Sequence, residues 1–417
     1  MSCALYGIKR NKEHRACSTI DIFIRKVSFM FHRTHDELKQ LGADTTTSEI
    51  MQQPELWRDT FSIYRNQLDD IETFLSDARS MADGRLVVIF TGAGTSDYVG
   101  DTCAPYLRHA GDTSRYEFKS IATTDIVSAP LDFVNPDDPT LLVSFARSGN
   151  SPESLAAIEV VRKYVKQAKF LNITCAPNGK LAIKSANDPD SHTVLIPRAN
   201  DGGFAMTGSY TCMELLATLI FDDAPIDQKE SWVSIAAEMG EEVILREHEI
   251  AAFLDDDFNR VTYLGSGSFG GLAQEAQLKI LELAHGLIAT SYDTSMGYRH
   301  GPKSFVDSKT LVFVFVSENE YTRQYDLDIL NEIDHDKIAQ KVIAIQQKSD
   351  NPYSGISFTF DSAECLPESY LALPFVMVAQ TVALLNSIRV GNTPDTPSPN
   401  GTVNRVVKGV TIHPFNA

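Results

Sequence analysis

Short runs of apolar residues recur along the chain and predict the strands of a sheet. In the first half these runs lie at 86–90, 140–145, 169–174 and 193–196. A helix is expected after the second run, because Pro152 and the acidic residue that follows it are both favoured in a first helical turn. Strands that alternate with helices at this spacing form a parallel sheet covered on both faces. The pattern therefore predicts an α/β fold.

The same order of runs returns in the second half of the chain. Three pairs of equivalent positions are separated by nearly the same number of residues. The pairs are 92 and 265, 141 and 311, and 171 and 343. Three matches at nearly one offset indicate that a whole domain is duplicated. Segment 260–268 repeats segment 86–96, segment 307–315 repeats segment 138–145, and segment 341–345 repeats segment 169–173.

The repeat divides the chain into five expected parts. They are a partly disordered N-terminal extension at 1–49, a first domain at 50–222, a helical linker at 223–250, a second domain at 251–390 and a tail at 391–417. Apolar residues at helical spacing between positions 56 and 74 predict a helical segment before the first sheet. The tail begins with turn-forming residues and ends in a β-like run at 403–412.

The balance of charge argues against two classes of partner. The 417 residues include 37 Lys and Arg against 55 Asp and Glu, which gives a net charge of −18. Nucleic acids and anionic membranes both need a basic protein surface, so neither is expected as a partner. An anionic substrate would need a local pocket of positive potential. The most apolar run, 371–388, is interrupted by Pro374, Gln380 and Asn386 and is interpreted as a buried helix.

The cysteines and the N-terminus bear on the cellular compartment. No two of the six cysteines form a C-x-x-C pair, so we expect reduced thiols in a cytoplasmic protein, with neither a zinc site nor a disulfide framework. Residues 1–33 are basic and lack the unbroken apolar core of a signal peptide. They are either a mobile extension or the result of a start assigned upstream of Met30. The cysteines are Cys3, Cys17, Cys103, Cys175, Cys212 and Cys365.

Two turns rich in glycine and hydroxyl residues follow strands of the first half and predict a phosphate site. Glycines let the backbone approach a ligand, hydroxyls donate hydrogen bonds, and the next helix offers its N-terminal amides. The first turn lacks the lysine of a Walker A loop, which argues against hydrolysis of a nucleoside triphosphate. Each turn alone is equally well a tight connection without a ligand, but the pair favours a ligand. The candidate residues are Gly94, Thr95, Ser96, Arg147, Ser148 and Ser151.

Candidate groups for proton transfer lie in the second half. Glu275 and Glu282 are seven residues apart on one helix face, with Lys279 between them. They are either a solvated ladder of charges, which the spacing alone favours, or they include a buried carboxylate that acts as a base. His300 lies in the loop 296–303, whose glycine and proline residues indicate irregular backbone. A buried carboxylate beside a loop histidine suits proton transfer at a carbon next to a carbonyl.

The two halves are not equivalent in their chemistry. The segment Ser-Glu-Asn-Glu at 317–320 replaces the second hydroxyl-rich turn and would repel a phosphate. We therefore expect the phosphate in the first half and the proton chemistry in the second. The segment 265–270 matches the pattern G-x-G-x-x-G after a strand, which leaves a nicotinamide-dependent dehydrogenase as an alternative. Asp293, the nearest candidate for the ribose-binding acid, is poorly placed for that role.

At these motifs the sequence resembles a known group of proteins. The duplicated sheet with turns G-x-G-T-S and S-G-x-S resembles the sugar isomerase (SIS) superfamily over roughly residues 50–417. More narrowly, the motifs GAGTS, SFARSGNSPES, LKxxE, GYRHGPKS, NTPDTPS and GTVNRVVKGV occur in an order that resembles the bacterial tagatose-6-phosphate ketose/aldose isomerase family. The resemblance implies two tandem SIS domains, each a flavodoxin-like parallel sheet flanked by helices, after an N-terminal helical segment. It also implies a C-terminal tail over the active site.

The isomerase half of glucosamine-6-phosphate synthase, a related protein, suggests roles for single residues. Its phosphate-binding hydroxyls correspond to Thr95, Ser148 and Ser151, and its enediol-forming glutamate corresponds to Glu282. Its ring-opening histidine, which comes from the neighbouring subunit, corresponds to His300. The resemblance therefore implies at least a homodimer in which His300 is donated across the interface.

The C-terminal tail matches this relative at one further candidate residue, whereas the turn after the second apolar run differs from it. The relative's C-terminal lysine corresponds to Lys408, which the resemblance makes a catalytic candidate. Ala146 and Arg147 stand where the relative has Ser and Gln, so the phosphate contacts differ. Arg147 could supply a bidentate cation to the phosphate.

Members of the narrower family act as galactosamine-6-phosphate deaminase/isomerases. The resemblance thus implies conversion of D-galactosamine 6-phosphate to D-tagatose 6-phosphate and ammonia in amino-sugar catabolism, without a metal or cofactor. Two alternatives remain: an aldose-ketose isomerase for another hexose 6-phosphate, of glucosamine or tagatose type, and a SIS protein that only senses a sugar phosphate. A sensing regulator would typically carry a DNA-binding helical domain, which the acidic sequence does not indicate.

Overall fold

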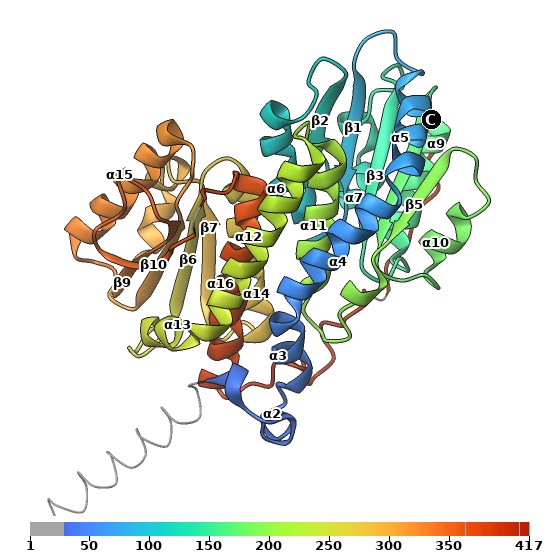
Figure 1. Cartoon of the computed structure of the whole chain (residues 1–417). Coiled ribbons are helices and arrows are strands. Elements are labelled where there is room, and N and C mark those ends of the chain that lie inside the picture. The colour runs from blue at the N-terminus through green and yellow to red at the C-terminus, as the bar shows by residue number, and fades with distance from the viewer. Residues whose placement is uncertain (1–28, 363, 408, 417) are drawn as a thin grey trace, which may run out of the picture.

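The architecture consists of two sheets with a layer of helices between them (Figure 1). It is known from a computed structural model that describes residues 29–362, 364–407 and 409–416. The first sheet has the strand order β2-β1-β3-β4-β5 and the second has the order β10-β9-β8-β6-β7. All strand pairs are parallel, and the second order is the first one repeated in the other half. This is the 2-1-3-4-5 order of flavodoxin-like sheets, so the predicted fold class and duplication are confirmed.

The central strands coincide with the predicted apolar runs, whereas three edge strands, β2, β7 and β10, were missed. Exposed or partly exposed residues interrupt each of these three strands, so they lack the continuous apolar run that marks a strand covered on both faces. The strands are β1 (Leu86–Thr91), β2 (Tyr116–Ser120), β3 (Thr140–Ala146), β4 (Ala168–Thr174), β5 (Ser191–Leu195), β6 (Arg260–Gly265), β7 (Ala289–Asp293), β8 (Thr310–Phe315), β9 (Lys341–Gln347) and β10 (Ile356–Phe360).

The helices that flank the sheets follow the same repeat. The first half contains α6 (Thr95–Ala110), α7 (Thr123–Ser128), α8 (Pro130–Phe133), α9 (Pro152–Tyr164), α10 (Lys180–Ser185), η2 (Pro197–Ala199) and α11 (Gly208–Phe221). The second half contains α14 (Ser268–Leu283), η3 (Gly297–Arg299), η4 (Pro302–Phe305), α15 (Glu320–Asp336) and α16 (Glu368–Arg389). Between the halves lie α12 (Ile226–Leu245) and α13 (Glu247–Phe253).

The N-terminal part of the described chain is helical. It contains η1 (Met30–His32), α2 (His35–Leu41), α3 (Asp44–Met51), α4 (Gln53–Asn66) and α5 (Leu68–Arg79). Met30 is fully buried, and its backbone N–H donates to the carboxylate of Glu247 on α13. The predicted boundary after residue 49 lies inside α3, so residues 29–49 pack as part of the folded chain. The division into domains stays a prediction.

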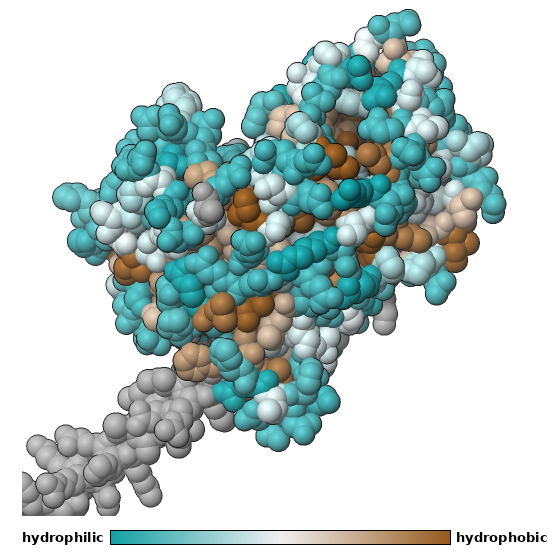
Figure 2. Space-filling view, in the orientation of Figure 1, coloured by the Kyte–Doolittle hydropathy of each residue, from teal (hydrophilic) through white to brown (hydrophobic). Residues whose placement is uncertain are grey.

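Helix α16 lies at the centre of the layer between the sheets (Figure 1). Its length and composition would allow it to cross a membrane, but its whole apolar window is buried inside the protein. It packs against α14, α12 and α11, which join the two halves into one core. The predicted buried helix at 371–388 is confirmed. Hydrophilic residues cover most of the surface seen from this side, and apolar residues form separate patches on it (Figure 2).

The described part of the tail after α16 forms turns and contains no strand. The predicted β-like run at 403–412 is therefore wrong for the residues that the structure describes. A β-like segment needs a sheet edge to pair with, but this one crosses loops of the first half. The carboxylate of Asp395 accepts hydrogen bonds from the backbone of Thr45 and Thr46, and the Arg405 guanidinium donates to the carbonyls of Asp201 and Gly203. The tail thus returns from the second half to the first.

Candidate active site

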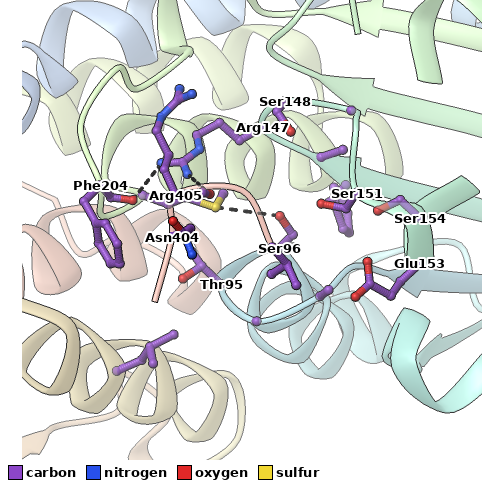
Figure 3. Close-up of a pocket in the computed structure, with 18 of the residues that line it drawn as sticks. Thr95, Ser96, Arg147, Ser148, Ser151, Glu153, Ser154, Phe204, Asn404 and Arg405 are labelled. Atoms are coloured by element: carbon purple, nitrogen blue, oxygen red, sulfur yellow. Dashed lines mark hydrogen bonds between the residues drawn. The ribbon is translucent and has the colours of Figure 1, made fainter. Parts of the chain in front are cut away.

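One pocket, here the first-half pocket, brings together most of the predicted site residues (Figure 3). It has a volume of about 340 Å³ and lies where the turns after β1 and β3 face α14 of the other half. All six predicted phosphate-binding residues and Glu282 line it. Two further walls come from the loop before α11 and from the tail. These walls contain Phe204, Met206, Val403, Asn404, Arg405 and Val407.

Gly94 shapes the turn at which α6 begins. Its backbone angles, φ 57° and ψ −129°, are strained for any residue with a side chain. At Gly92 in the same turn, an added Cβ would approach the backbone of Ser96 to 2.2 Å. These two glycines let the chain reverse directly into α6, so that Thr95 and Ser96 stand at its N-terminus beside the pocket. The positive end of the helix dipole favours an anion there.

The turn after β3 contributes a second group of hydroxyls. Figure 3 shows Ser148, Ser151 and Ser154 along one side of the pocket. Ser151 precedes α9, but its side chain makes no capping hydrogen bond to that helix. Its hydroxyl can therefore donate to a ligand. The two hydroxyl-bearing turns come from adjacent strands of one sheet, as their spacing in the sequence predicts.

Arg147 connects three walls of the first-half pocket. Its side chain is buried, and its Nη1 donates to the carbonyls of Gly203 and Phe204 at 3.3 and 3.1 Å. Its Nη2 donates to the carbonyl of Arg405 in the tail at 2.9 Å. Burial and the neighbouring Arg405 lower the pKa of Arg147, against the opposing effect of Asp201 and other acids. Both terminal nitrogens thus bind main-chain carbonyls, and the bidentate contact with a phosphate that Arg147 could supply stays a prediction.

Lys279 links the two halves through Thr95 and Glu282, which both line the pocket. Its Nζ donates to the Thr95 hydroxyl at 2.9 Å and to the Glu282 carboxylate at 2.6 Å, and it lies 3.4 Å from Glu275. Lys279 and Glu275 are fully buried, while the Glu282 side chain is 23% exposed toward the pocket that it lines. The interpretation as a solvated ladder of charges is therefore wrong. Periodicity located the shared helix face, but it could not show that another domain covers that face.

Burial and the neighbouring charges determine the protonation states of Glu275 and Lys279. Burial raises the pKa of Glu275 to about 8, although Lys279 opposes the shift. Burial would lower the pKa of Lys279, but the negative charge of Glu275, when that group is ionised, and the negative charge of Glu282 outweigh this effect and raise it. Glu275 is then largely neutral near pH 7. The charge of Lys279 remains to pair with the Glu282 carboxylate.

Glu275→Gln is expected to reduce the loss of stability between pH 5 and pH 8. The folded-state pKa of about 8 lies above the ordinary value of 4.5, so between these values the folded state keeps a proton that the unfolded chain releases. Stability from this group therefore falls as the pH rises through that window. Glutamine has no proton to lose. Urea denaturation of both proteins at the two pH values measures the difference, and an equal loss in both would contradict it.

His300 lies outside the first-half pocket. It follows η3 on an exposed turn of the second half, and it does not line the pocket. On either side of it, Arg299 Nε and Lys303 Nζ bind Glu332 of α15 at 2.6 and 2.5 Å. The turn is thus held against α15 while the His300 ring stays exposed. Lys408, the other catalytic candidate, lies outside the described residues.

The turn at 265–270, which suggested a dinucleotide, faces acidic groups. Gly267 and Ser268 line a separate pocket with Glu318 and Glu368, whose carboxylates would repel a pyrophosphate. The residues that the structure describes include no group of three or more His, Cys, Asp or Glu side chains placed to hold a metal ion.

Known proteins are similar to this chain in sequence and in fold. The chain is 42% identical over 377 residues to the D-galactosamine-6-phosphate deaminase AgaS of Escherichia coli O157:H7, covering 89% of this chain and 96% of that protein. The crystal structure of tagatose-6-phosphate ketose/aldose isomerase from Escherichia coli matches with a TM-score of 0.80 and 37% identity, over 89% of this chain and 97% of that one.

A more distant structure shares the fold alone. The C-terminal domain of glucosamine-fructose-6-phosphate aminotransferase from Francisella tularensis matches with a TM-score of 0.69 and 20% identity, over 84% of this chain and 98% of that one. No family model matches the chain. The high identity over nearly the full length of the bacterial relatives, together with the two sheets of the same order, confirms the predicted family. The chain belongs to the AgaS family of tandem sugar isomerase (SIS) proteins.

Proposed function

We propose that this protein converts D-galactosamine 6-phosphate to D-tagatose 6-phosphate and ammonia. The observation that carries the proposal is that a carboxylate of the second half, Glu282, lines the same pocket as the hydroxyl-rich turns of the first half. A relative with 42% identity is named for the deaminase activity, and a structural relative is named for tagatose 6-phosphate. Phosphate recognition beside a base is what aldose-to-ketose chemistry needs.

The phosphate group docks on the two turns. Thr95, Ser96, Ser148 and Ser151 donate hydrogen bonds to it, and the turn at Gly94 lets it approach the N-terminus of α6. Arg147 and Arg405 add positive charge at this pocket, although the chain as a whole carries a net charge of −18. The docked phosphate fixes the far end of the sugar and directs its C1 and C2 atoms toward Glu282.

Proton transfer then follows. Once the pyranose ring is open, Glu282 removes the C2 proton and leaves an enolamine. Return of a proton to C1 gives a C2 imine, and water adds to the imine carbon and releases ammonia and the ketose 6-phosphate. The scheme requires only a general base and hydrogen-bond donors at the developing enediolate oxygens, so it needs no metal or cofactor.

We assign ring opening to a histidine that acts in addition to the base Glu282. No histidine is among the described residues that line this pocket, and His300 is exposed on the turn held by α15. Both observations support donation of His300 of the partner subunit, within a homodimer or a larger homo-oligomer. Cys103, Cys175 and Cys212 are buried free thiols, which supports a cytoplasmic location.

Release of ammonia tests the proposal directly. Galactosamine 6-phosphate and glucosamine 6-phosphate are incubated separately with the protein, without added cofactor, and ammonia and ketose 6-phosphate are measured. We expect ammonia from the galacto sugar. D-Tagatose 6-phosphate is the third substrate, and its interconversion with an aldose phosphate, without ammonia from either amino sugar, would instead favour plain isomerisation. Binding of either sugar phosphate without turnover would favour a sensing protein.

Gly94→Ala is expected to lower stability and to raise KM for the sugar phosphate. An added Cβ meets no atom within 4 Å, so the loss comes from the backbone angles and amounts to about 1–3 kcal/mol. The matched control is Gly267→Ala, because Gly267 has φ 57° and ψ −126° in the equivalent turn of the second half. Thermal denaturation should show similar losses in both variants, whereas steady-state kinetics should show a raised KM in Gly94→Ala alone. An unchanged KM in both would exclude the turn at Gly94 from phosphate binding.

A further inference from the structure

The second half contains a pocket in the position equivalent to the first-half pocket. This second-half pocket has a volume of about 380 Å³, close to the 340 Å³ of the other. Gly267 and Ser268 line it from the turn after β6, where Gly267 repeats the backbone angles of Gly94. Glu318 and Asn319 line it from the turn after β8. The duplication therefore repeats the pocket as well as the sheet.

The two central helices confirm that the pockets are equivalent. Leu278 and Glu282 of α14 line the first-half pocket, while Pro105 and His109 of α6 line the second-half pocket. The two pairs, 105 with 278 and 109 with 282, both have the same offset as positions 92 and 265 of the repeat. Each helix thus begins at the pocket of its own half and ends at the pocket of the other. His109 occupies the position that Glu282 has in the first half.

The chemistry of the second-half pocket is different. Glu318 is the equivalent of Ser148, with the same offset as positions 141 and 311 of the repeat, so a carboxylate replaces a phosphate-binding hydroxyl. Glu368, at the start of α16, adds a second carboxylate. Among the described residues that line this pocket, none is Lys or Arg. A phosphate would be repelled here, whereas a group with a positive charge would be attracted.

The existing partners of these carboxylates leave acceptor capacity for a ligand. Glu318 Oε2 accepts hydrogen bonds at 2.7 Å from Arg323 and from Gln347. Glu368 Oε1 accepts a hydrogen bond from the Ser317 hydroxyl. Burial raises the pKa of Glu368, which indicates a carboxyl group without enough compensation by positive charge. Each carboxylate has a second oxygen on which an ammonium group can bind.

Ser268 provides an independent indication of a ligand. Its side chain is fully buried at the first residue of α14 and lines the second-half pocket. The hydroxyl lies beside the Glu368 carboxyl group and lowers its pKa against the effect of burial, but it makes no hydrogen bond of normal geometry within the part of the chain that the structure describes. A buried hydroxyl without a partner costs free energy unless a ligand or water satisfies it.

We propose that the second-half pocket binds a hydroxylated primary ammonium compound without phosphate, of the amino-sugar class. Its ammonium group lies between Glu318 and Glu368, and its hydroxyl groups bind Ser268, Asn319 and His109. The first-half pocket selects a phosphate through hydroxyls and helix N-termini, while the second-half pocket selects an amine through carboxylates. Binding here does not depend on turnover in the other pocket.

Titration calorimetry with D-galactosamine tests the site, with D-galactose as the ligand that lacks the amine. Glu368→Gln removes one charge and keeps the shape of the side chain. His109→Trp fills the pocket from an exposed position, so it tests the site even where Glu368→Gln lowers stability. Glu282→Gln makes the same chemical change in the first-half pocket, beside the C2 position of a sugar bound there, and is the matched control for binding at the wrong place.

We expect D-galactosamine to bind, and we expect Glu368→Gln and His109→Trp each to weaken binding about tenfold or more, while Glu282→Gln leaves it unchanged. D-Galactose should bind at least about tenfold more weakly than the amine. The proposal is overturned if D-galactosamine does not bind, if D-galactose binds equally well, or if Glu282→Gln alone weakens binding.

Discussion

Glu282→Gln is expected to lower kcat by about 10²- to 10⁴-fold, because glutamine cannot accept the C2 proton. The substitution keeps the length of the side chain and its place beside Lys279. The phosphate-binding turns are untouched, so KM should change little. Steady-state release of ammonia from galactosamine 6-phosphate measures the loss. Exchange of the C2 hydrogen with deuterated solvent, followed by NMR, tests the same step without relying on product formation.

Glu275→Gln is the matched control for this experiment. It makes the same chemical change on the same face of α14, seven residues earlier. Because burial raises the pKa of Glu275 to about 8, glutamine resembles the form that dominates at neutral pH. Turnover should therefore remain near that of the unmodified protein at pH 7. Equal losses in both variants would mean that disturbance of α14, rather than removal of a base, explains the effect.

Lys279→Met is expected to lower kcat/KM by about a hundredfold and also to destabilise the fold. The ammonium group orients both Glu282 and the Thr95 hydroxyl, and methionine keeps only the apolar part of the side chain. Removal of one partner from a buried ion pair typically costs about 3–5 kcal/mol. The cost should be smaller here, since the Glu282 side chain is 23% exposed. Urea denaturation and steady-state kinetics measure the two effects separately.

A double-mutant cycle distinguishes positioning by Lys279 from a purely structural role. If Lys279 acts through Glu282, then Lys279→Met should reduce turnover much less in the Glu282→Gln background than in the unmodified protein. A purely structural role predicts the same fractional loss in both backgrounds. Thr95→Val completes the comparison, because it removes the other hydrogen-bond partner of the ammonium group.

Much of the fold could be predicted because its pattern is local. The buried central strands appear as continuous apolar runs, and the nearly constant offset between the halves identified the duplication. The edge strands β2, β7 and β10 escaped because partial exposure removes that pattern. The β-like run in the tail was predicted wrongly, because local composition does not show whether a sheet edge is available.

The candidate residues of the site were found from chemistry and motif, but their arrangement was not. Residue types and spacing identified the hydroxyl-rich turns and the two acids on α14. Only the tertiary structure shows that Lys279 is buried and reaches Thr95, 184 residues away in the chain. It also shows that Arg147 binds the carbonyls of the loop before α11 and of the tail. No sequence signal marked that loop as a wall of the pocket.

By itself, the sequence determined the alternation of strands and helices and its duplication, the turns able to cradle a phosphate, and the acid available as a base. These features depend on the conformational freedom of glycine, on helix periodicity and on side-chain chemistry, all of which act over a few residues. The tertiary structure decided which of these groups meet. Packing of α14 against α6 brings Glu282 of one half to the turns of the other, and the same packing creates the equivalent pocket with His109 and Glu368. Contacts between distant segments depend on how whole helices cover each other, which no local pattern records.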